Sequence, residues 1–160
     1  MMLIDSLKQS PIFEEFSDSE LDALERAMTI SEYPEGHIFV REGDGRVSHN
    51  EDAMYVIVEG EVSMTISRGG DHFGIIGTMP VGTVFGILAL IAPDVRAATC
   101  SASGPVRAAS LNKSAFDYLF ESNAPLAFKF QFALARQLAR DLRKANHELY
   151  RALLDVGAAG

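Results

Sequence analysis

This sequence of 160 residues has one cysteine and no long uninterrupted hydrophobic run. A single cysteine, Cys100, cannot form an internal disulfide, which fits a reducing compartment and leads us to expect a cytoplasmic protein. The longest apolar stretch, 84–92, is far shorter than the ~20 residues of a membrane-spanning helix. Asp5 interrupts the N-terminus too early for a signal peptide. We therefore expect neither a membrane span nor export.

Basic residues are also scarce, because 14 Lys+Arg stand against 22 Asp+Glu and the net charge is −8. The deficit lies mainly in residues 1–60, with a net charge of −10, whereas residues 125–151 carry 6 basic and 2 acidic side chains. A basic helix in that segment could bind phosphate groups, but a solvated helix face is the commoner explanation. Nucleic-acid binding is therefore the minority interpretation.

The middle of the chain has the pattern of short antiparallel strands. Apolar and polar residues alternate over 62–67, and the fuller apolar run Met54–Val58 indicates a buried strand. Glycine and proline turns divide this region at roughly regular spacing, and the polar segment 45–53 is expected to be a loop. The length suits one domain and nearly excludes a two-domain enzyme. This pattern favours an antiparallel sandwich or jelly roll.

Helices are expected on both sides of these strands. Ser17 and Glu20 have the spacing of a capping box, Asn112 is a candidate N-cap, and Pro125 suits the first position of a final long helix. The predicted fold is mainly β, an antiparallel sandwich or jelly roll with N-terminal helices and a long C-terminal helix. We expect residues 1–124 to hold the helices and jelly roll, and residues 125–160 to form a dimerisation or lid helix within the same structural unit.

The final helix carries an apolar stripe at alternating steps of three and four residues, with a gap at Gln131, as a coiled-coil seam requires. The stripe consists of Phe128, Ala135, Leu138, Leu142, Ala145, Leu149, Ala152 and Val156. It extends past what one small sandwich could cover, so we expect a parallel homodimer. The alternative is an amphipathic helix docked on its own domain.

A candidate anion site lies between Gly82 and Thr99. The turn at Gly86 leads into a short apolar segment whose first backbone N–H groups would lack partners, and Arg96 follows nine residues after Ile87. Backbone donors at a helix start and one guanidinium can together bind an anion. Alone the pattern is weak evidence, because such turns and arginines are common.

The segment Phe85-Gly86-Ile87-Leu88-Ala89-Leu90, with Arg96-Ala97-Ala98-Thr99 after it, resembles the phosphate-binding cassette of the cyclic-nucleotide-binding domain family. This family includes the catabolite activator protein and the regulatory subunit of cyclic-AMP-dependent protein kinase. Its pattern is Phe-Gly-Glu-(Leu/Ile)-Ala-Leu, then Arg-(Ala/Ser/Thr)-Ala-(Thr/Ser) at the same nine-residue step. The resemblance covers nearly the whole chain, including Tyr33-Pro34-Glu35-Gly36 and the long terminal helix. It implies an antiparallel β jelly roll (double-stranded β-helix) with N-terminal helices and a long C-terminal helix.

The resemblance implies a ligand-binding site. Its residues would be Phe85, Gly86, Ile87, Leu88, Ala89, Arg96, Ala97, Ala98 and Thr99. Arg96 would bind the cyclic phosphate, helped by backbone N–H groups near Leu88, Ala89 and Ala97. Family domains cap the base with a residue of the last helix, for which the candidates here are Arg143, Asn146 and His147. The implied ligand is cyclic AMP or another cyclic nucleotide, and no further cofactor is expected.

One departure from the family pattern concerns the ribose. Where the family has a glutamate that accepts the 2′-hydroxyl, this sequence has Ile87, and no carboxylate is left in 85–90. Loss of a hydrogen bond to a charged acceptor removes ~1.5–3 kcal/mol of binding energy. The ligand therefore need not be cyclic AMP, although the retained Arg96 favours an anionic occupant.

These features predict a stand-alone, non-enzymatic regulatory domain that senses such a ligand and signals to a protein effector in trans, since few residues follow the last helix. The alternative is a ligand-free scaffold that keeps the fold and the dimer seam. Ile87 favours the scaffold, whereas Gly86 and Arg96 oppose it.

An enzyme has little support in the sequence. It would need paired acid and base residues or a metal site. The four histidines, His37, His49, His72 and His147, are scattered without metal-ligand spacing, so no metal is expected. Cys100 has no neighbouring base in sequence and is better explained as a small strand residue than as a nucleophile.

Overall fold

The computed structural model describes residues 2–41, 53–67, 73–92 and 98–159. Its elements along the chain are α1 (Leu3–Lys8), η1 (Pro11–Phe13), α2 (Asp18–Ala27), β1 (Thr29–Tyr33), β2 (Ile38–Val40), β3 (Ala53–Glu59), β4 (Val62–Ser67), β5 (Phe73–Met79), β6 (Val84–Phe85), α3 (Leu88–Ile91), β7 (Thr99–Ala102), β8 (Val106–Asn112), α4 (Lys113–Ser122) and α5 (Ala124–Ala159). The expected loop 45–53 lies outside the described residues except for Ala53, which begins β3.

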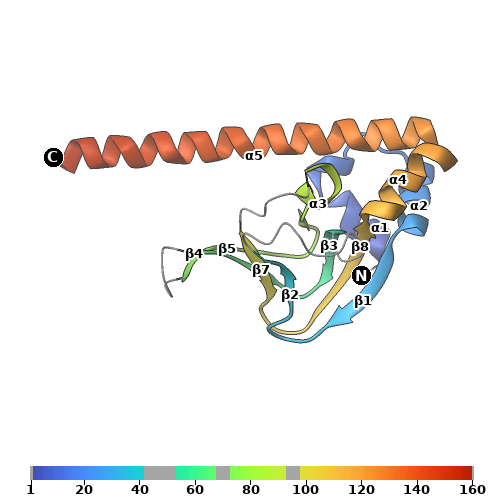
Figure 1. The fold of residues 1–160 in the computed structure, drawn as a ribbon, viewed down its shortest axis with the longest axis horizontal. Helices are drawn as coiled ribbons and strands as arrows, with labels where there is room; N and C mark the ends of the chain where they lie inside the picture. The colour runs from blue at the N-terminus through green and yellow to red at the C-terminus, as the bar shows by residue number, and fades with distance from the viewer. Residues whose placement is uncertain (1, 42–52, 68–72, 93–97, 160) are drawn as a thin grey trace.

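The described strands form two antiparallel four-stranded sheets, which confirms the predicted jelly-roll fold. The strand orders are β1-β8-β3-β6 and β2-β7-β4-β5. The short helices lie beside the first sheet, and α5 runs past the whole domain (Figure 1). The alternating strand predicted over 62–67 is β4, which pairs with β5 on one side and β7 on the other.

Strand β3 is buried on both faces, as its fuller apolar run predicted. Met54, Val56 and Val58 belong to one cluster of buried residues, and Tyr55 and Ile57 belong to another, because successive side chains of a strand point to opposite faces. We call the first the helix-side cluster, since it also contains residues of α1, α2, α4 and α5. The second, between the two sheets, is the barrel cluster. The first sheet therefore lies between two apolar layers.

The predicted helix caps are present. The Glu20 N–H donates to Ser17 Oγ at 3.2 Å, and the Ser17 N–H donates to Glu20 Oε1 at 3.0 Å, which completes the capping box of α2. The side chain of Asn112 accepts from the backbone of α4 at 2.8 Å. Pro125 is the second residue of α5 rather than the first, because the helix already begins at Ala124.

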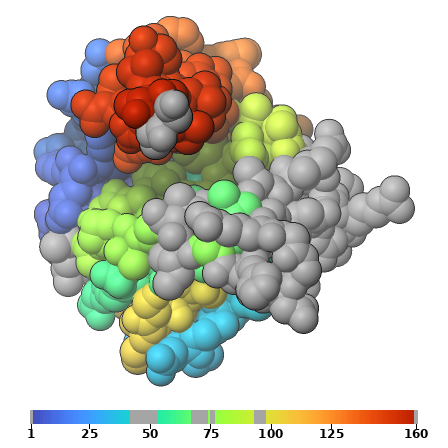
Figure 2. All heavy atoms as spheres, turned by 90° about the vertical axis from the view of Figure 1, so that its left-hand side faces the viewer, coloured from blue at the N-terminus to red at the C-terminus, as the bar shows by residue number. Residues whose placement is uncertain are grey.

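Helix α5 has two different environments along its length. Its first turns bury Leu126, Ala127, Phe130 and Leu134 in the helix-side cluster. From 141 to 158 every residue is exposed. Figure 1 shows this part of α5 continuing beyond the strands, and Figure 2, drawn toward its C-terminal end, shows it at the edge of the molecule. One half of α5 therefore completes the domain core and the other half projects from it.

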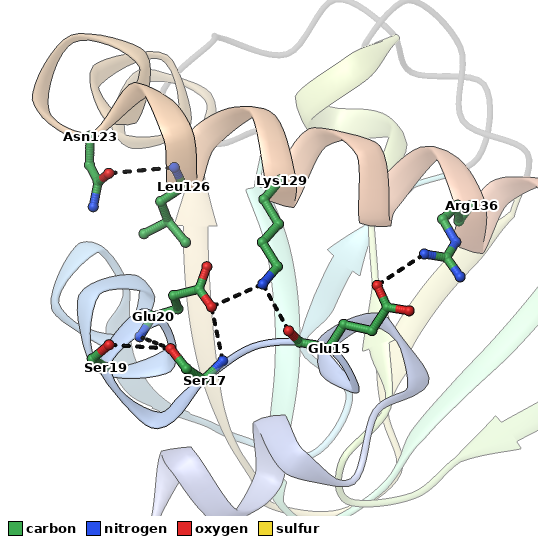
Figure 3. Close-up of polar contacts among 8 residues, drawn as sticks. All are labelled: Glu15, Ser17, Ser19, Glu20, Asn123, Leu126, Lys129 and Arg136. Atoms are coloured by element: carbon green, nitrogen blue, oxygen red, sulfur yellow. Dashed lines mark hydrogen bonds and ion pairs between the residues drawn. The ribbon is translucent and has the colours of Figure 1, made fainter.

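Two ion pairs hold the start of α5 against the N-terminal segment (Figure 3). Lys129 Nζ lies 2.9 Å from Glu20 Oε1 and donates to the Glu15 carbonyl oxygen at 2.8 Å. Arg136 Nη1 lies 3.3 Å from Glu15 Oε2. Two of the basic residues that could have bound nucleic acid therefore already contact carboxylates of their own chain.

Candidate functional site

The predicted cassette begins at a tight turn between β6 and α3. Gly86 has φ +76°, a conformation that residues with a Cβ rarely adopt. A Cβ at this position would also lie only 2.7 Å from the carbonyl oxygen of Ala53. Two independent constraints thus require glycine here, the positive φ and the close approach of the turn to β3.

Aromatic rings fix the residue before the turn. Phe85 pairs in register with Tyr55 of β3, and the two rings stack with centroids 5.2 Å apart. Phe39 from β2 contacts both rings, at 5.4 Å from Phe85 and 5.0 Å from Tyr55. Tyr33 extends this group through Phe39 at 4.7 Å. The start of the cassette is therefore anchored in the barrel cluster, and sequence periodicity had not indicated these ring contacts.

Ile87, in the position of the family glutamate, points to the other side of the sheet. Its side chain is only 6% exposed and belongs to the helix-side cluster together with Leu90, Leu3 and Leu7. Ile87 is also the N-cap residue of α3 and makes no side-chain capping hydrogen bond. A carboxylate at 87 would have to leave this apolar cluster before it could reach a ribose.

The backbone donors expected at the start of α3 are partly used within the turn. The Ala89 N–H donates to the Gly86 carbonyl oxygen at 3.0 Å, and the Leu90 N–H donates to the Ile87 carbonyl oxygen at 3.0 Å. Ala89 is fully buried and Leu88 is half-buried. The Ala89 N–H is therefore already paired within the turn.

The second half of the predicted cassette is only partly described. Arg96 and Ala97 lie outside the described residues, and Ala98 and Thr99, both half-buried, resume the chain at β7. Thr99 pairs with Thr65 of β4. Cys100 follows as a buried strand residue of the barrel cluster, in agreement with its interpretation as a strand residue.

The residues predicted on α5 have different environments. The base-cap candidates Arg143, Asn146 and His147 all lie on the exposed part of the helix. Most of the expected seam is exposed as well, but Leu138 is partly buried and packs against the helix-side cluster of its own domain. Leu138 is therefore less available to a second helix than the stripe implied.

Glu20, at the contact between α2 and α5, has a shifted pKa. The hydrogen bond from the Ser17 N–H, followed by the one from Lys129, lowers the pKa of Glu20 below its ordinary value of 4.5. Among the described residues no three His, Cys, Asp or Glu side chains gather as metal ligands. No helix within the described ranges is long and apolar enough to cross a membrane.

Comparison with known proteins identifies the family of this jelly roll. Residues 30–123 match the family described as cyclic nucleotide-binding domain, so the chain belongs to that family. The matched range contains both sheets except for Thr29, the first residue of β1, together with the glycine turn and α4.

Individual relatives are regulators. The chain is 25% identical over 143 residues to the CRP-like cAMP-activated global transcriptional regulator of Mycobacterium tuberculosis, with 89% of this chain and 60% of that protein covered. It superposes on the Thermus thermophilus catabolite activator protein with a TM-score of 0.74 and 26% identity, over 88% of this chain and 62% of the other. A cyclic nucleotide-binding domain from Methylobacillus flagellatus gives a TM-score of 0.77 at 23% identity, over 92% and 80% of the two chains. The chain thus spans about 60% of the length of the curated regulator.

Proposed function

We propose that this domain is a sensor of an anionic ligand of the cyclic-nucleotide class and that it regulates a protein effector in trans, without catalytic activity of its own. Family membership supports the ligand class. The observation that carries the proposal is the turn at Gly86, because its positive φ and close approach to Ala53 require the glycine that the family cassette has at this position. The retained Arg96 supplies the positive charge that a cyclic phosphate needs.

The ligand contacts that we assign differ from those of the family at the ribose. Arg96 binds the phosphate, and the turn residues Phe85–Ala89 with 97–99 form the wall around it. Ile87 offers no acceptor to a 2′-hydroxyl and is occupied in the helix-side cluster. A ligand that makes little use of that hydroxyl, such as a cyclic dinucleotide or another cyclic phosphate, is therefore as suitable as cyclic AMP.

We also propose that residues 1–124 and 125–160 act as one unit, in which the first binds ligand and the second forms a homodimer and covers the base. Burial of Leu126, Phe130 and Leu134 supports mechanical coupling between the two parts. Arg143, Asn146 and His147 are exposed near the middle of α5 and suit a base contact. The single, buried Cys100 fits a cytoplasmic setting. Nucleic acid is not a proposed partner of this chain.

Calorimetry with cyclic mononucleotides and cyclic dinucleotides tests the proposal. Arg96→Ala should weaken binding by about 2–5 kcal/mol, roughly 30-fold to several thousand-fold, because it removes the charged partner of the phosphate. Arg107→Ala is the matched control, since Arg107 is a half-exposed arginine of β8 paired with Glu59 at 3.4 Å. Equal binding by the wild type and Arg96→Ala would move the site elsewhere.

A second candidate function is a ligand-free scaffold. It is favoured by one observation, the burial of Ile87 in the helix-side cluster. The family glutamate at this position would instead face a ligand. The same titrations separate the two functions. Absence of heat with every cyclic nucleotide, from a folded wild-type protein, would favour the scaffold.

A further inference from the structure

All the lysine and arginine residues of α5 lie on one side of the helix. At about 100° per residue, their spacing keeps them within roughly a third of its circumference. Tyr150 and Leu154 lie on the same side and are 60% and 54% exposed. We call this side the basic stripe and define it by Lys129, Arg136, Arg140, Arg143, Lys144 and Arg151.

The basic stripe is separate from the other sides of α5. Leu142 of the expected seam is two residues from Arg140 and from Lys144, which places it about 200° away around the helix. The acidic residues of α5 are seven residues apart and form a line of their own, which consists of Asp141, Glu148 and Asp155. A homodimer through the expected seam therefore leaves the basic stripe accessible.

The first two residues of the basic stripe show what this side of the helix binds (Figure 3). Lys129 lies 2.9 Å from a carboxylate oxygen of Glu20, and Arg136 lies 3.3 Å from one of Glu15. The Lys129 ammonium also lies over the ring of Phe16, 4.9 Å from its centroid. The N-terminal segment thus docks on the start of the stripe with two carboxylates and an aromatic ring.

The rest of the basic stripe has the same charge but no such segment within the described part of the chain. Arg140 donates only to Gln137 of its own helix, at 2.6 Å. Arg143, Lys144 and Arg151 are exposed, and none of them forms an ion pair with a described residue. From 140 to 151 this part of the stripe is about 17 Å long, enough for several carboxylates of one partner segment.

We propose that residues 140–154 of α5 form the docking surface for an acidic segment of the protein effector. The segment carries carboxylates that pair with Arg140, Lys144 and Arg151, and apolar side chains that pack on Tyr150 and Leu154. The proposal rests on the proposed function, which requires an effector in trans, and it specifies the chemistry by which that effector is recognised.

An acidic protein segment fits this surface better than a nucleic acid does. The chain has a net charge of −8 and as a whole repels a long polyanion. Leu154, beside Arg151, offers nothing to a phosphate backbone but can pack against an apolar side chain of a protein. The start of the stripe already holds carboxylates of a protein segment, which is the same chemistry that we assign to its remaining part.

Fluorescence anisotropy with a synthetic peptide and the full chain tests the surface. The labelled probe has the sequence of residues 11–25, because the carboxylates of this segment already pair with the start of the stripe. We expect saturable binding that weakens as the salt concentration rises. A peptide in which Asn and Gln replace every Asp and Glu should bind at least tenfold more weakly.

A variant that combines Arg140→Gln, Lys144→Gln and Arg151→Gln should bind the acidic peptide roughly tenfold more weakly, since three exposed ion pairs are lost. Arg143 is kept because it is a candidate base contact. Nucleotide binding by calorimetry and mass by light scattering should therefore equal those of the wild type, and circular dichroism should show the same helix content.

The matched control combines Arg26→Gln, Arg41→Gln and Lys113→Gln. It changes the net charge by the same three units, but all three residues lie outside α5. It should bind the acidic peptide as the wild type does. Equal losses in the two triple variants would mean that the peptide senses net charge rather than the basic stripe.

The outcomes separate the docking surface from the proposed function. The surface is wrong if the wild type does not bind the acidic peptide, if the α5 triple variant binds it equally well, or if duplex DNA or phosphatidylserine vesicles bind the stripe more tightly. If no cyclic nucleotide binds but peptide binding is lost in the α5 triple variant alone, the sensor is rejected and the docking surface stands. Loss of peptide binding with nucleotide binding retained supports both.

Discussion

The rings of Tyr55 and Phe85 stack between the two sheets, with centroids 5.2 Å apart and planes inclined by 18°. Phe85 immediately precedes the Gly86 turn, and Tyr55 belongs to β3, one of the two central strands of its sheet. The stack therefore ties the cassette to the most buried part of the fold. Substitutions that weaken the packing of Phe85 should therefore lower both the free energy of unfolding and the affinity for ligand.

Phe85→Ala should lower the free energy of unfolding by about 3–5 kcal/mol, since it removes a buried ring and leaves a cavity beside Tyr55. Urea unfolding followed by circular dichroism measures the change. Tyr118→Ala is the control, because Tyr118 is an exposed aromatic residue of α4, and it should cost no more than about 0.5 kcal/mol. Similar losses in both variants would contradict the anchoring role of Phe85.

A comparison of Gly86→Ala with Gly36→Ala separates the strain of a positive φ from the steric clash at the Gly86 turn. Both glycines have positive φ, +76° and +83°, but a Cβ at Gly36 would meet no atom within 4 Å. Each variant should lose about 1–3 kcal/mol from backbone strain, and Gly86→Ala should lose clearly more because of the clash with the Ala53 carbonyl oxygen. Unfolding curves of the two variants give the difference between their free energies of unfolding. A difference near zero would mean that β3 can move away from the new Cβ at position 86.

Local sequence signals predicted the elements of the fold well. The capping box of Ser17 and Glu20, the Asn112 cap and the buried run Met54–Val58 are all confirmed, because each depends on residues that are close in sequence. Turn spacing predicted short antiparallel strands in a sandwich or jelly roll, and the family resemblance specified the jelly roll. The ion pair of Glu20 with Lys129 had no such signal, since 109 residues separate the two partners.

The site could be predicted by residue type but not by side-chain direction. The sequence placed Ile87 in a cassette, yet its burial depends on Leu3 and Leu7 of α1, far away in the chain. Likewise, the spacing of apolar residues shows which residues of α5 share a face, but not what that face contacts. Which face meets its own domain is decided by tertiary packing, and this is why Leu138 was expected in the dimer seam.

Ile87→Glu should destabilise the free protein by roughly 2–4 kcal/mol, because a carboxylate replaces an apolar side chain in the helix-side cluster. Cyclic AMP should restore part of this loss, since its ribose hydroxyl gives the carboxylate a partner outside the cluster. Thermal unfolding with and without nucleotide measures both effects. 2′-Deoxy cyclic AMP should give no such recovery, and equal recovery with both ligands would show that residue 87 does not meet a ribose.

Glu20 should make stability depend on pH. Its pKa in the folded protein is lowered by hydrogen bonds from the Ser17 N–H and Lys129, so its stabilising contribution is fully present above about 4.5 and is lost as the pH falls through the lowered value. The difference in free energy of unfolding between wild type and Glu20→Gln should shrink over that range. Glutamine keeps the capping acceptor, so the comparison isolates the charge.

Lys129→Met supplies the control for this pH effect. It removes the cation but leaves the hydrogen bond from Ser17. The pH-dependent difference should therefore decrease without vanishing, because the Ser17 N–H is the larger cause of the lowered pKa. A wild-type curve parallel to that of Glu20→Gln from pH 7 to pH 3 would contradict the assignment.

Leu142→Glu tests the dimer itself, since Leu142 belongs to the expected seam of α5 and is 62% exposed in the single chain. Two facing carboxylates in an apolar seam would repel each other and lose their hydration, so the variant should be a monomer of 17.4 kDa by light scattering where the wild type has twice that mass.

His147→Glu adds the same charge at an exposed position off the seam and should remain a dimer. The monomer should also stay folded, because residues 141–158, which are all exposed, contribute nothing to the buried clusters of their own domain. If the wild type is a monomer at micromolar concentration and Leu142→Glu does not change this, the exposed face of α5 is not a dimer interface.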